Sequence, residues 1–248
     1  MSIMETVETA SPTASGAPAL AAELPALDTG VRLELLAERF RGRVVATSSF
    51  GLQSAVMLHL LKEHAPDIPV VFIDTGYLFE ETYNYADTLQ ELLGMEAHVY
   101  SPRMTPARQE ALFGKLWEQG PEGLERYSRI NKIEPMNRAL TDFGADVWIS
   151  GLRRTQSSTR SDREFAEQQA QTLKVYPILD WDDQQVAEYL RKHNLPPHPL
   201  AAKGYVKMVD WLSTKTADQS ATVEETRFSG EKYECGLHLD SGEQDFQI

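Results

Sequence analysis

The stretch RVVATSSFGLQSAVMLHLLKEHAP, residues 43–66, decides the fold. It begins with a short apolar run rich in β-branched residues, Val44–Thr47, which predicts a buried strand. A turn of small residues follows, and apolar residues at helical spacing then predict a helix over Gln53–His64. A strand that passes through a short turn directly into a helix is the first half of a βαβ unit.

The same plan recurs along the chain. A second strand, Val70–Ile73, leads into a helix that ends near Leu93, and further strands are predicted at residues 95–100, Asp146–Ser150 and 173–181. Strands that alternate with helices predict an α/β fold, in which helices cover both faces of a parallel twisted sheet. The periodicity is lost after about residue 200.

The composition excludes several classes of function. The 248 residues carry a formal net charge of −13, which opposes non-specific binding to nucleic acid or to an anionic membrane. No apolar run is long enough to span a bilayer. The first basic residue is Arg32, so residues 1–26 do not resemble a signal peptide and are expected to form a disordered leader. A chain with one cysteine is expected in a reducing compartment, the cytoplasm.

Three polar loops follow predicted strands: SSFGLQS at 48–54, DTGYLF at 74–79 and SGLRRTQSSTR at 150–160. Because open parallel sheets bind ligands beyond the carboxyl ends of their strands, we expect these loops to converge on one site. Small residues in the first loop let backbone N–H groups close on an anion, and guanidinium groups in the third bind phosphate or sulfate oxygens. A serine-capped turn and a solvated basic loop are the alternative interpretations.

The only cysteine, Cys235, lies in the polar stretch KYECGLHLD, residues 232–240. A lone cysteine more often fills an apolar core, so this setting favours a chemical role. His238 is a neighbour that favours the thiolate when it is protonated. One cysteine cannot build a cysteine zinc site or hold an iron–sulfur cluster within one subunit. The histidines show no ligand spacing of the HExxH kind, so no metal site is expected.

The three loops and five further motifs together resemble the phosphoadenylyl-sulfate (PAPS) reductases of assimilatory sulfate reduction. The further motifs are GKLWEQG (114–120), INKIEPMNRAL (130–140), YPILDW (176–181), EETRFSG (224–230) and ECGLH (234–238). The resemblance implies an adenine nucleotide α-hydrolase-like fold related to the PP-loop proteins, with residues 27–200 as the nucleotide-binding domain and 201–248 as an irregular tail. It also implies a homodimer that uses thioredoxin or glutaredoxin as reductant.

The first loop differs from that of the related ATP pyrophosphatases, which reads Ser-Gly-Gly-x-Asp-Ser. Phe50, Gly51 and Gln53 stand at the positions of its two glycines and its aspartate. This difference favours holding a phosphosulfate over cleaving ATP. Relatives that reduce unphosphorylated adenylyl sulfate (APS) carry additional cysteine pairs for a [4Fe–4S] cluster. Because residues 126–136 contain no cysteine, the chain resembles the cluster-free branch, which has no cofactor.

One segment departs from the pattern of the PAPS reductases. The family typically reads Gly-Asp-x-His-Ser/Thr-Thr where this chain reads VDWLST, residues 209–214. Val209 replaces the glycine and Leu212 replaces the histidine, whereas Asp210 is kept. We expect this change to weaken contacts with the substrate.

The resemblance also implies a mechanism. The Cys235 thiolate attacks the sulfuryl sulfur of PAPS, and an external thiol then releases sulfite from the S-sulfocysteine. The expected catalytic residues are Cys235 and His238, and the expected substrate-binding residues are Ser48, Ser49, Gly51, Gln53, Asp74, Thr75, Gly76, Lys132, Arg153, Arg154, Arg160 and Arg227. The alternatives are an APS reductase, an ATP-using pyrophosphatase or adenylyltransferase subunit, and a diverged non-catalytic protein that binds adenine nucleotides.

Overall fold

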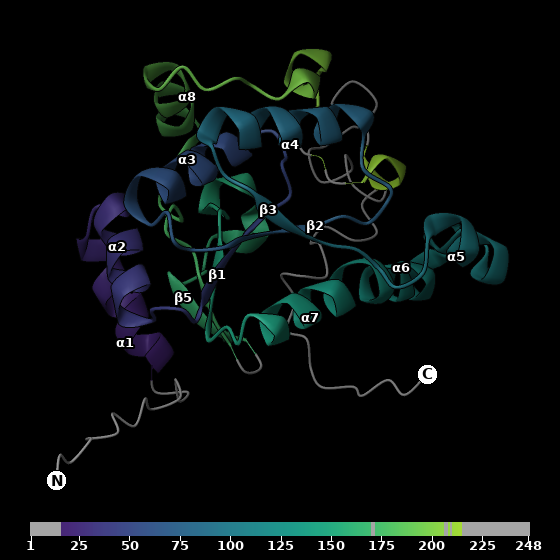
Figure 1. The fold of residues 1–248 in the computed structure, drawn as a ribbon, viewed down its shortest axis with the longest axis horizontal. Helices are drawn as coiled ribbons and strands as arrows, with labels where there is room; N and C mark the ends of the chain where they lie inside the picture. The colour runs from purple at the N-terminus through teal and green to yellow at the C-terminus, as the bar shows by residue number, and fades with distance from the viewer. Residues whose placement is uncertain (1–15, 170–171, 206–207, 209, 215–248) are drawn as a thin grey trace, which may run out of the picture.

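A six-stranded sheet forms the centre of the protein in the computed structural model, which describes residues 16–169, 172–205, 208 and 210–214. The strand order is β3-β2-β1-β4-β6-β5 (Figure 1). The strands are β1 (Val44–Ser48), β2 (Val70–Ile73), β3 (Ala97–Tyr100), β4 (Val147–Ser150), β5 (Ala166–Gln169) and β6 (Thr172–Val175). Neighbours pair in parallel except β5, which runs antiparallel to β6. The predicted α/β fold is confirmed.

The edge strand β5 was not predicted from the apolar patterns. Its sequence, AEQQ, contains a single apolar residue. An edge strand is partly solvated and needs no continuous apolar run, so the pattern that reveals the central strands is missing here.

Helices cover both faces of the sheet (Figure 1). They are α1 (Gly16–Glu23), α2 (Thr29–Arg39), α3 (Ser54–His64), α4 (Glu80–Leu93), α5 (Pro106–Phe113), α6 (Gly120–Ser128), α7 (Glu134–Asp142) and α8 (Asp183–Lys192). Among the described residues, no helix is both long and apolar enough to cross a membrane.

Alternation along the central strands divides the core into two layers. Val44 and Ala46 of β1 belong to the large cluster that includes residues of α2, α3 and α4. Val45 faces the other way and shares a second cluster with Trp148 of β4 and Met136 of α7. Both faces of β1 are therefore buried, as the continuous apolar run predicts for a central parallel strand.

The sequence patterns left residues 101–145 without predicted elements, and these residues supply an additional helical arm. Figure 1 shows α5 and α6 reaching beyond the edge of the sheet. A π-helical turn, Arg129–Ile133, joins α6 to α7. The side-chain amides of Gln109 and Asn131 exchange two hydrogen bonds, of 2.8 and 3.0 Å, and so tie α5 to this turn. Turns of this kind are frequent at functional sites, and this one carries Lys132.

The prediction of a disordered leader over residues 1–26 is wrong for residues 16–26. These residues form α1 and a short 3₁₀ turn, Leu24–Ala26. Leu20 is 2% exposed and Leu24 is fully buried. Ala17, Leu20, Ala21 and Leu24 follow the i, i+3, i+4, i+7 spacing of a buried helical face, so the signal was present within the Ala- and Pro-rich composition. Residues 1–15 lie outside the described residues.

Candidate active site

The first loop follows β1 and is held by its own side chains. The Ser48 hydroxyl accepts a hydrogen bond of 3.1 Å from the Phe50 N–H. Phe50 has a φ of 47°, a left-handed conformation that is unfavourable for a bulky residue. Its side chain is fully buried and meets the ring of Phe72 edge-on, with ring centroids 4.9 Å apart. The Ser54 hydroxyl closes the loop by donating to the Gly51 carbonyl oxygen at 2.7 Å.

The DTG loop, residues 74–76, follows β2 and also holds its own shape. One oxygen of Asp74 accepts hydrogen bonds from the Gly76 N–H at 2.8 Å and the Tyr83 hydroxyl at 2.6 Å. Gly76 has a φ of 75°, and a Cβ there would lie 2.5 Å from Cγ of Pro106. Only glycine fits this turn without displacing α5. Thr75 is buried and directs its hydroxyl away from solvent.

Arg153, after β4, links the third loop to the first. Its side chain is 1% exposed, and its guanidinium donates to the Gln53 side-chain oxygen and, at 2.7 Å, to a carboxylate oxygen of Asp183. It also donates to the backbone oxygen of Trp181 at 3.2 Å and to the Thr155 hydroxyl at 3.0 Å. Hydrogen bonding to Arg153 lowers the pKa of Asp183 below its usual value. Asp183 was not predicted as a site residue.

The other two arginines of the third loop have side-chain partners different from those of Arg153. Arg154 donates to the backbone oxygen of Arg163 at 2.8 and 3.1 Å and lies over the ring of Phe165. Arg160 donates to the side-chain oxygen of Gln156 at 2.6 Å. Both are half-buried, and a substrate contact for either remains a prediction.

Lys132 and Asp210 form a buried ion pair beneath the DTG loop. The lysine nitrogen lies 2.5 Å from one carboxylate oxygen, and the two side chains are 2% and 0% exposed. The Thr75 hydroxyl donates to the other carboxylate oxygen at 2.6 Å. Asp210 was not predicted as a site residue, although the sequence keeps the aspartate of the family pattern at this position.

Leu212, two residues after Asp210, has an apolar and aromatic environment. Leu212 is partly buried against a cluster formed by Tyr77, Leu116 and Tyr127. Burial, followed by the charge of Asp210, raises the pKa of Tyr127 well above its usual value, so this phenol stays neutral. The expectation that the change at Leu212 weakens contacts with the substrate stays a prediction. Val209 lies outside the described residues.

The predicted residues thus fall into four groups, one of which is Arg154 and Arg160 with the partners given above. Those of the first and second loops follow β1 and β2, which are neighbours in the sheet, and Arg153, after β4, contacts Gln53 of the first loop. Lys132 reaches the DTG loop through Asp210. Cys235, His238 and Arg227 lie outside the described residues, so their roles remain predictions. Within the described part of the chain, no group of three or more His, Cys, Asp or Glu side chains gathers as metal ligands would.

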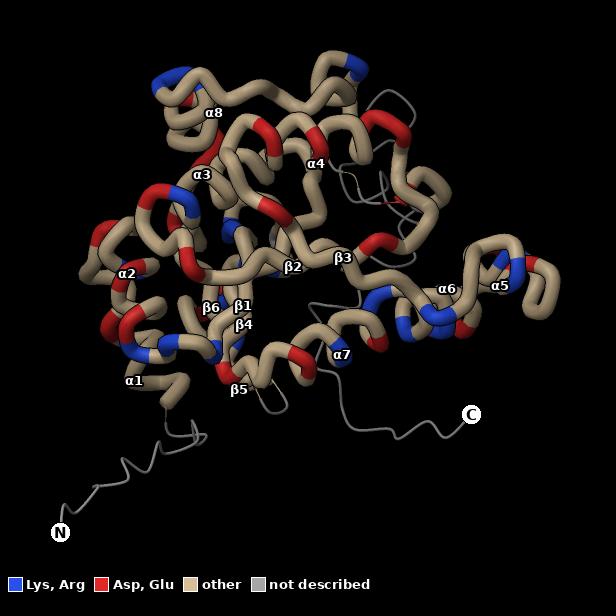
Figure 2. The backbone as a smooth tube through the Cα atoms, in the orientation of Figure 1, with Lys and Arg blue, Asp and Glu red and all other residues tan. Residues whose placement is uncertain are grey.

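Acidic residues are frequent on the outer helices, for example along α4, as Figure 2 shows. Arg153, after β4, and Lys132, in the π-helical turn, are in contrast buried. An anionic ligand would therefore meet the loops at the carboxyl ends of β1, β2 and β4 and not a basic outer surface.

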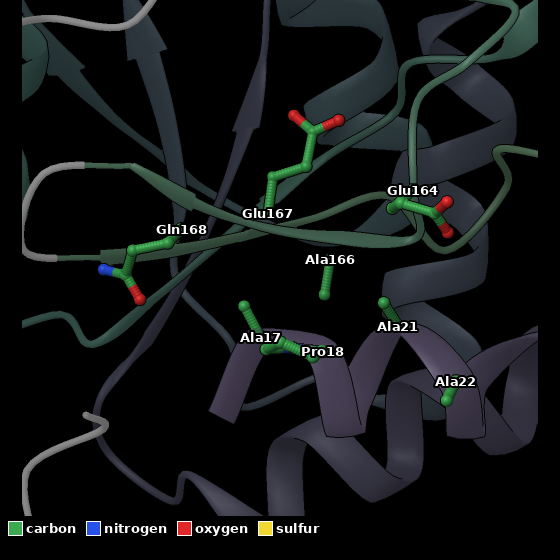
Figure 3. Close-up of a pocket in the computed structure, with 8 residues that line it drawn as sticks. All are labelled: Ala17, Pro18, Ala21, Ala22, Glu164, Ala166, Glu167 and Gln168. Atoms are coloured by element: carbon green, nitrogen blue, oxygen red, sulfur yellow. The ribbon is translucent and has the colours of Figure 1, made fainter. Parts of the chain in front are cut away.

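A cavity on another flank carries none of the predicted site residues. It lies between α1 and β5, has a volume of about 560 Å³, and is lined by Ala17, Pro18, Ala21, Ala22, Glu164, Ala166, Glu167 and Gln168. Figure 3 shows the small side chains of α1 facing the strand. Alanine methyl groups and peripheral carboxylates offer no groups suited to hold a phosphosulfate.

Comparison with known proteins identifies the family. A model of the phosphoadenosine phosphosulfate reductase domain matches residues 43–216. The chain belongs to this family. Among the family's curated members, a phosphoadenosine 5′-phosphosulfate reductase of Alkalilimnicola ehrlichii is 53% identical over 200 residues, covering 81% of this chain and 82% of that protein. One of Cronobacter sakazakii is 48% identical over 217 residues, covering 88% of this chain and 89% of that protein.

Solved structures agree with the fold. The phosphoadenylyl-sulfate reductase of Candida auris, crystallised as a phosphate complex, superposes with a TM-score of 0.72 at 25% identity, covering 83% of this chain and 99% of that one. An FMN adenylyltransferase of Candida glabrata gives a TM-score of 0.57 at 13% identity, covering 87% of this chain and 69% of that one. The second likeness concerns the fold alone. Together they confirm an adenine nucleotide α-hydrolase-like fold, as the sequence motifs had implied.

Proposed function

We propose that this protein is an oxidoreductase that converts PAPS to sulfite and adenosine 3′,5′-bisphosphate in sulfate assimilation. The observation that carries the proposal is the 53% identity to a phosphoadenosine 5′-phosphosulfate reductase over 81% of the chain. The arrangement of the loops supports it, because the ends of the neighbouring strands β1, β2 and β4 carry the turn predicted to bind an anion, the DTG loop and Arg153.

The chemistry takes two displacements at sulfur of the substrate and the enzyme adduct, and a third that frees the enzyme from the reductant. In the first, the Cys235 thiolate attacks the sulfuryl sulfur, a sulfur–sulfur bond forms, and the bond to the phosphate oxygen breaks, so that adenosine 3′,5′-bisphosphate leaves. His238 helps to keep the thiol ionised. In the second, a thiolate of the reductant attacks Cys235 sulfur, releases sulfite and forms a mixed disulfide. A second thiol of the reductant then frees Cys235 and leaves the reductant oxidised.

The reductant is therefore a dithiol protein such as thioredoxin or glutaredoxin. The chain has one cysteine, so it cannot supply the resolving thiol within one subunit. The same count favours a reaction without an iron–sulfur cluster and a cytoplasmic location, where thiols stay reduced. A homodimer, as implied by the family resemblance, is part of this proposal.

The residues of the three loops have distinct roles in this proposal. Backbone N–H groups of the first loop hold the phosphosulfate. Gln53 brings no negative charge to that loop, whereas the aspartate of the pyrophosphatases would repel an anion. Arg153 fixes the orientation of the Gln53 side chain by donating to its oxygen. Arg154 and Arg160 are the candidates for stabilising the departing phosphate, and Arg227 is a further candidate from the sequence.

The test is anaerobic incubation with PAPS in the absence of reductant, followed by intact-mass analysis. The expected result is one added SO₃ group, mapped by peptide analysis to Cys235, with release of adenosine 3′,5′-bisphosphate. Cys235→Ser is the control and should bind the bisphosphate without forming the adduct. Equal adduct formation with APS would favour the APS reductase alternative, and ligand binding without any adduct would favour the non-catalytic one.

A further inference from the structure

Asp210 connects three segments that are distant in the sequence. Its carboxylate contacts Thr75 of the DTG loop and Lys132 of the π-helical turn. Two backbone contacts attach its own segment to the residues that follow the DTG loop. Asp210 forms a β-bridge with Leu78, and the Trp211 N–H donates a hydrogen bond of 2.9 Å to the backbone carbonyl oxygen of Tyr77. Two of the residues predicted to bind substrate therefore share one buried carboxylate.

Stability alone is a weak reason for such a pair. Taking two charges out of water is costly, and a buried ion pair is often no more stabilising than apolar residues of similar size. The surroundings are already apolar and aromatic, with Tyr77, Tyr127 and Leu212 in one cluster. The pair also lies at the carboxyl end of β2, where the fold places its ligands.

We propose that Asp210 is a positioning residue of the PAPS site, which fixes the Lys132 ammonium and the DTG loop in the arrangement that takes the substrate. This inference rests on the proposed PAPS reductase function. Asp210 itself is fully buried and acts through the other two residues. The Thr75 hydroxyl is oriented by donating to Asp210 and accepts a hydrogen bond of 3.2 Å from the Tyr77 N–H, so the carboxylate sets the course of the loop.

A double-variant cycle separates positioning from plain structural support. Lys132→Met and Asp210→Leu are made singly and together, and kcat/KM for PAPS and the melting temperature are measured for each. Each single variant leaves a group of the pair without its partner and should melt several degrees lower. The double variant removes both charges and puts apolar side chains of similar shape in their place, so its melting temperature should return most of the way to that of the unaltered protein.

Turnover should behave differently from stability. We expect kcat/KM to fall about tenfold or more in each single variant and to stay at that level in the double variant, because the two residues act as one unit. Recovery of kcat/KM together with the melting temperature would mean that the pair only supports the fold, and the proposal would be wrong. Losses that multiply in the double variant would equally overturn it, because Asp210 would then not act through Lys132.

Three further variants complete the experiment. Asp210→Asn, which keeps the size and an acceptor for Thr75, replaces Asp210→Leu in the cycle should the latter not fold. Thr75→Val removes only the hydroxyl and is expected to raise KM more than it lowers kcat. Asp146→Asn breaks the ion pair between Asp146 and Arg43, which lies at the amino ends of β1 and β4, away from the site. This variant should leave kcat/KM unchanged. Absence of PAPS turnover in the unaltered protein would refute the proposed function itself, which is a different result.

Discussion

Replacing Phe50 should reveal how the first loop keeps an unfavourable backbone conformation. Truncation of a buried phenylalanine to alanine costs about 3–5 kcal/mol. Phe50 is fully buried, so Phe50→Ala should lose an amount in this range. Alanine would stay strained at a φ of 47°, a conformation that costs about 1–2 kcal/mol for residues other than glycine. Phe50→Gly removes this strain, but the greater conformational freedom of glycine in the unfolded chain lowers the stability by about 0.5–1 kcal/mol. Taking the middle of each range, the glycine variant should be about 0.75 kcal/mol more stable than the alanine variant.

Urea unfolding of both variants measures this difference, and Phe72 provides the matched control. Phe72 lies in the regular strand β2, is 5% exposed and packs against the same ring. Because a strand does not need a left-handed residue, the order should reverse there, with Phe72→Ala more stable than Phe72→Gly. An alanine variant at position 50 that is as stable as the glycine variant would show that backbone strain does not shape the loop. A Phe50→Gly protein as stable as the unaltered one would refute the packing argument.

Three other outcomes are expected. Leu212→His should lower the melting temperature and kcat/KM, because it places a polar ring among Tyr77, Leu116 and Tyr127; faster turnover in steady-state assays would contradict the apolar packing of this segment. Leu24→Ala should cost about 2–5 kcal/mol in urea unfolding, since Leu24 is fully buried, and a loss below 1 kcal/mol would mean that the N-terminal helix contributes little. Burial lowers the pKa of His198 from 6.5 to about 4. Between these two pH values the imidazole is protonated in the unfolded chain but neutral in the folded protein, so stability falls as the pH drops below about 6.5. Between pH 7 and pH 5 the unaltered protein should lose about 2 kcal/mol more than His198→Gln, and equal losses would contradict a buried neutral imidazole.

The central part of the fold was predictable because its signals are local. Val44–Thr47 and Val70–Ile73 are continuous apolar runs, and a central parallel strand, buried on both faces, requires such a run. Strand β5 lacks one because it lies at an edge. Helix α1 escaped prediction for a different reason, because the Ala- and Pro-rich composition of residues 1–26 is typical of disordered segments and obscures the helical spacing of Leu20 and Leu24.

The site was predictable as far as loops that follow adjacent strands. The sequence placed Ser48, Thr75 and Arg153 after strands, and the sheet order brings those strand ends together. The partners of the charged residues were not predictable in the same way. Asp183 and Asp210 meet Arg153 and Lys132 across distances along the chain that no local pattern encodes. Burial of both cations followed from those pairings and was likewise missed.

These pairings change how an acidic protein could hold a polyanionic substrate. Arg153 and Lys132 are each paired with a carboxylate, so each pair is close to neutral and cannot by itself offset the net charge of −13. Their guanidinium and ammonium groups are better suited to fix the shape of the loops, because each ties together segments that would otherwise be independent. We therefore expect attraction for the anion to come mainly from backbone N–H groups at the turn between β1 and α3, with help from Arg154, whose guanidinium donates to a backbone oxygen. Backbone donors have fixed directions, so they select a ligand by its geometry as much as by its charge. On this view the strained Phe50 matters for function, because its buried ring holds the turn in the one conformation that aims those donors.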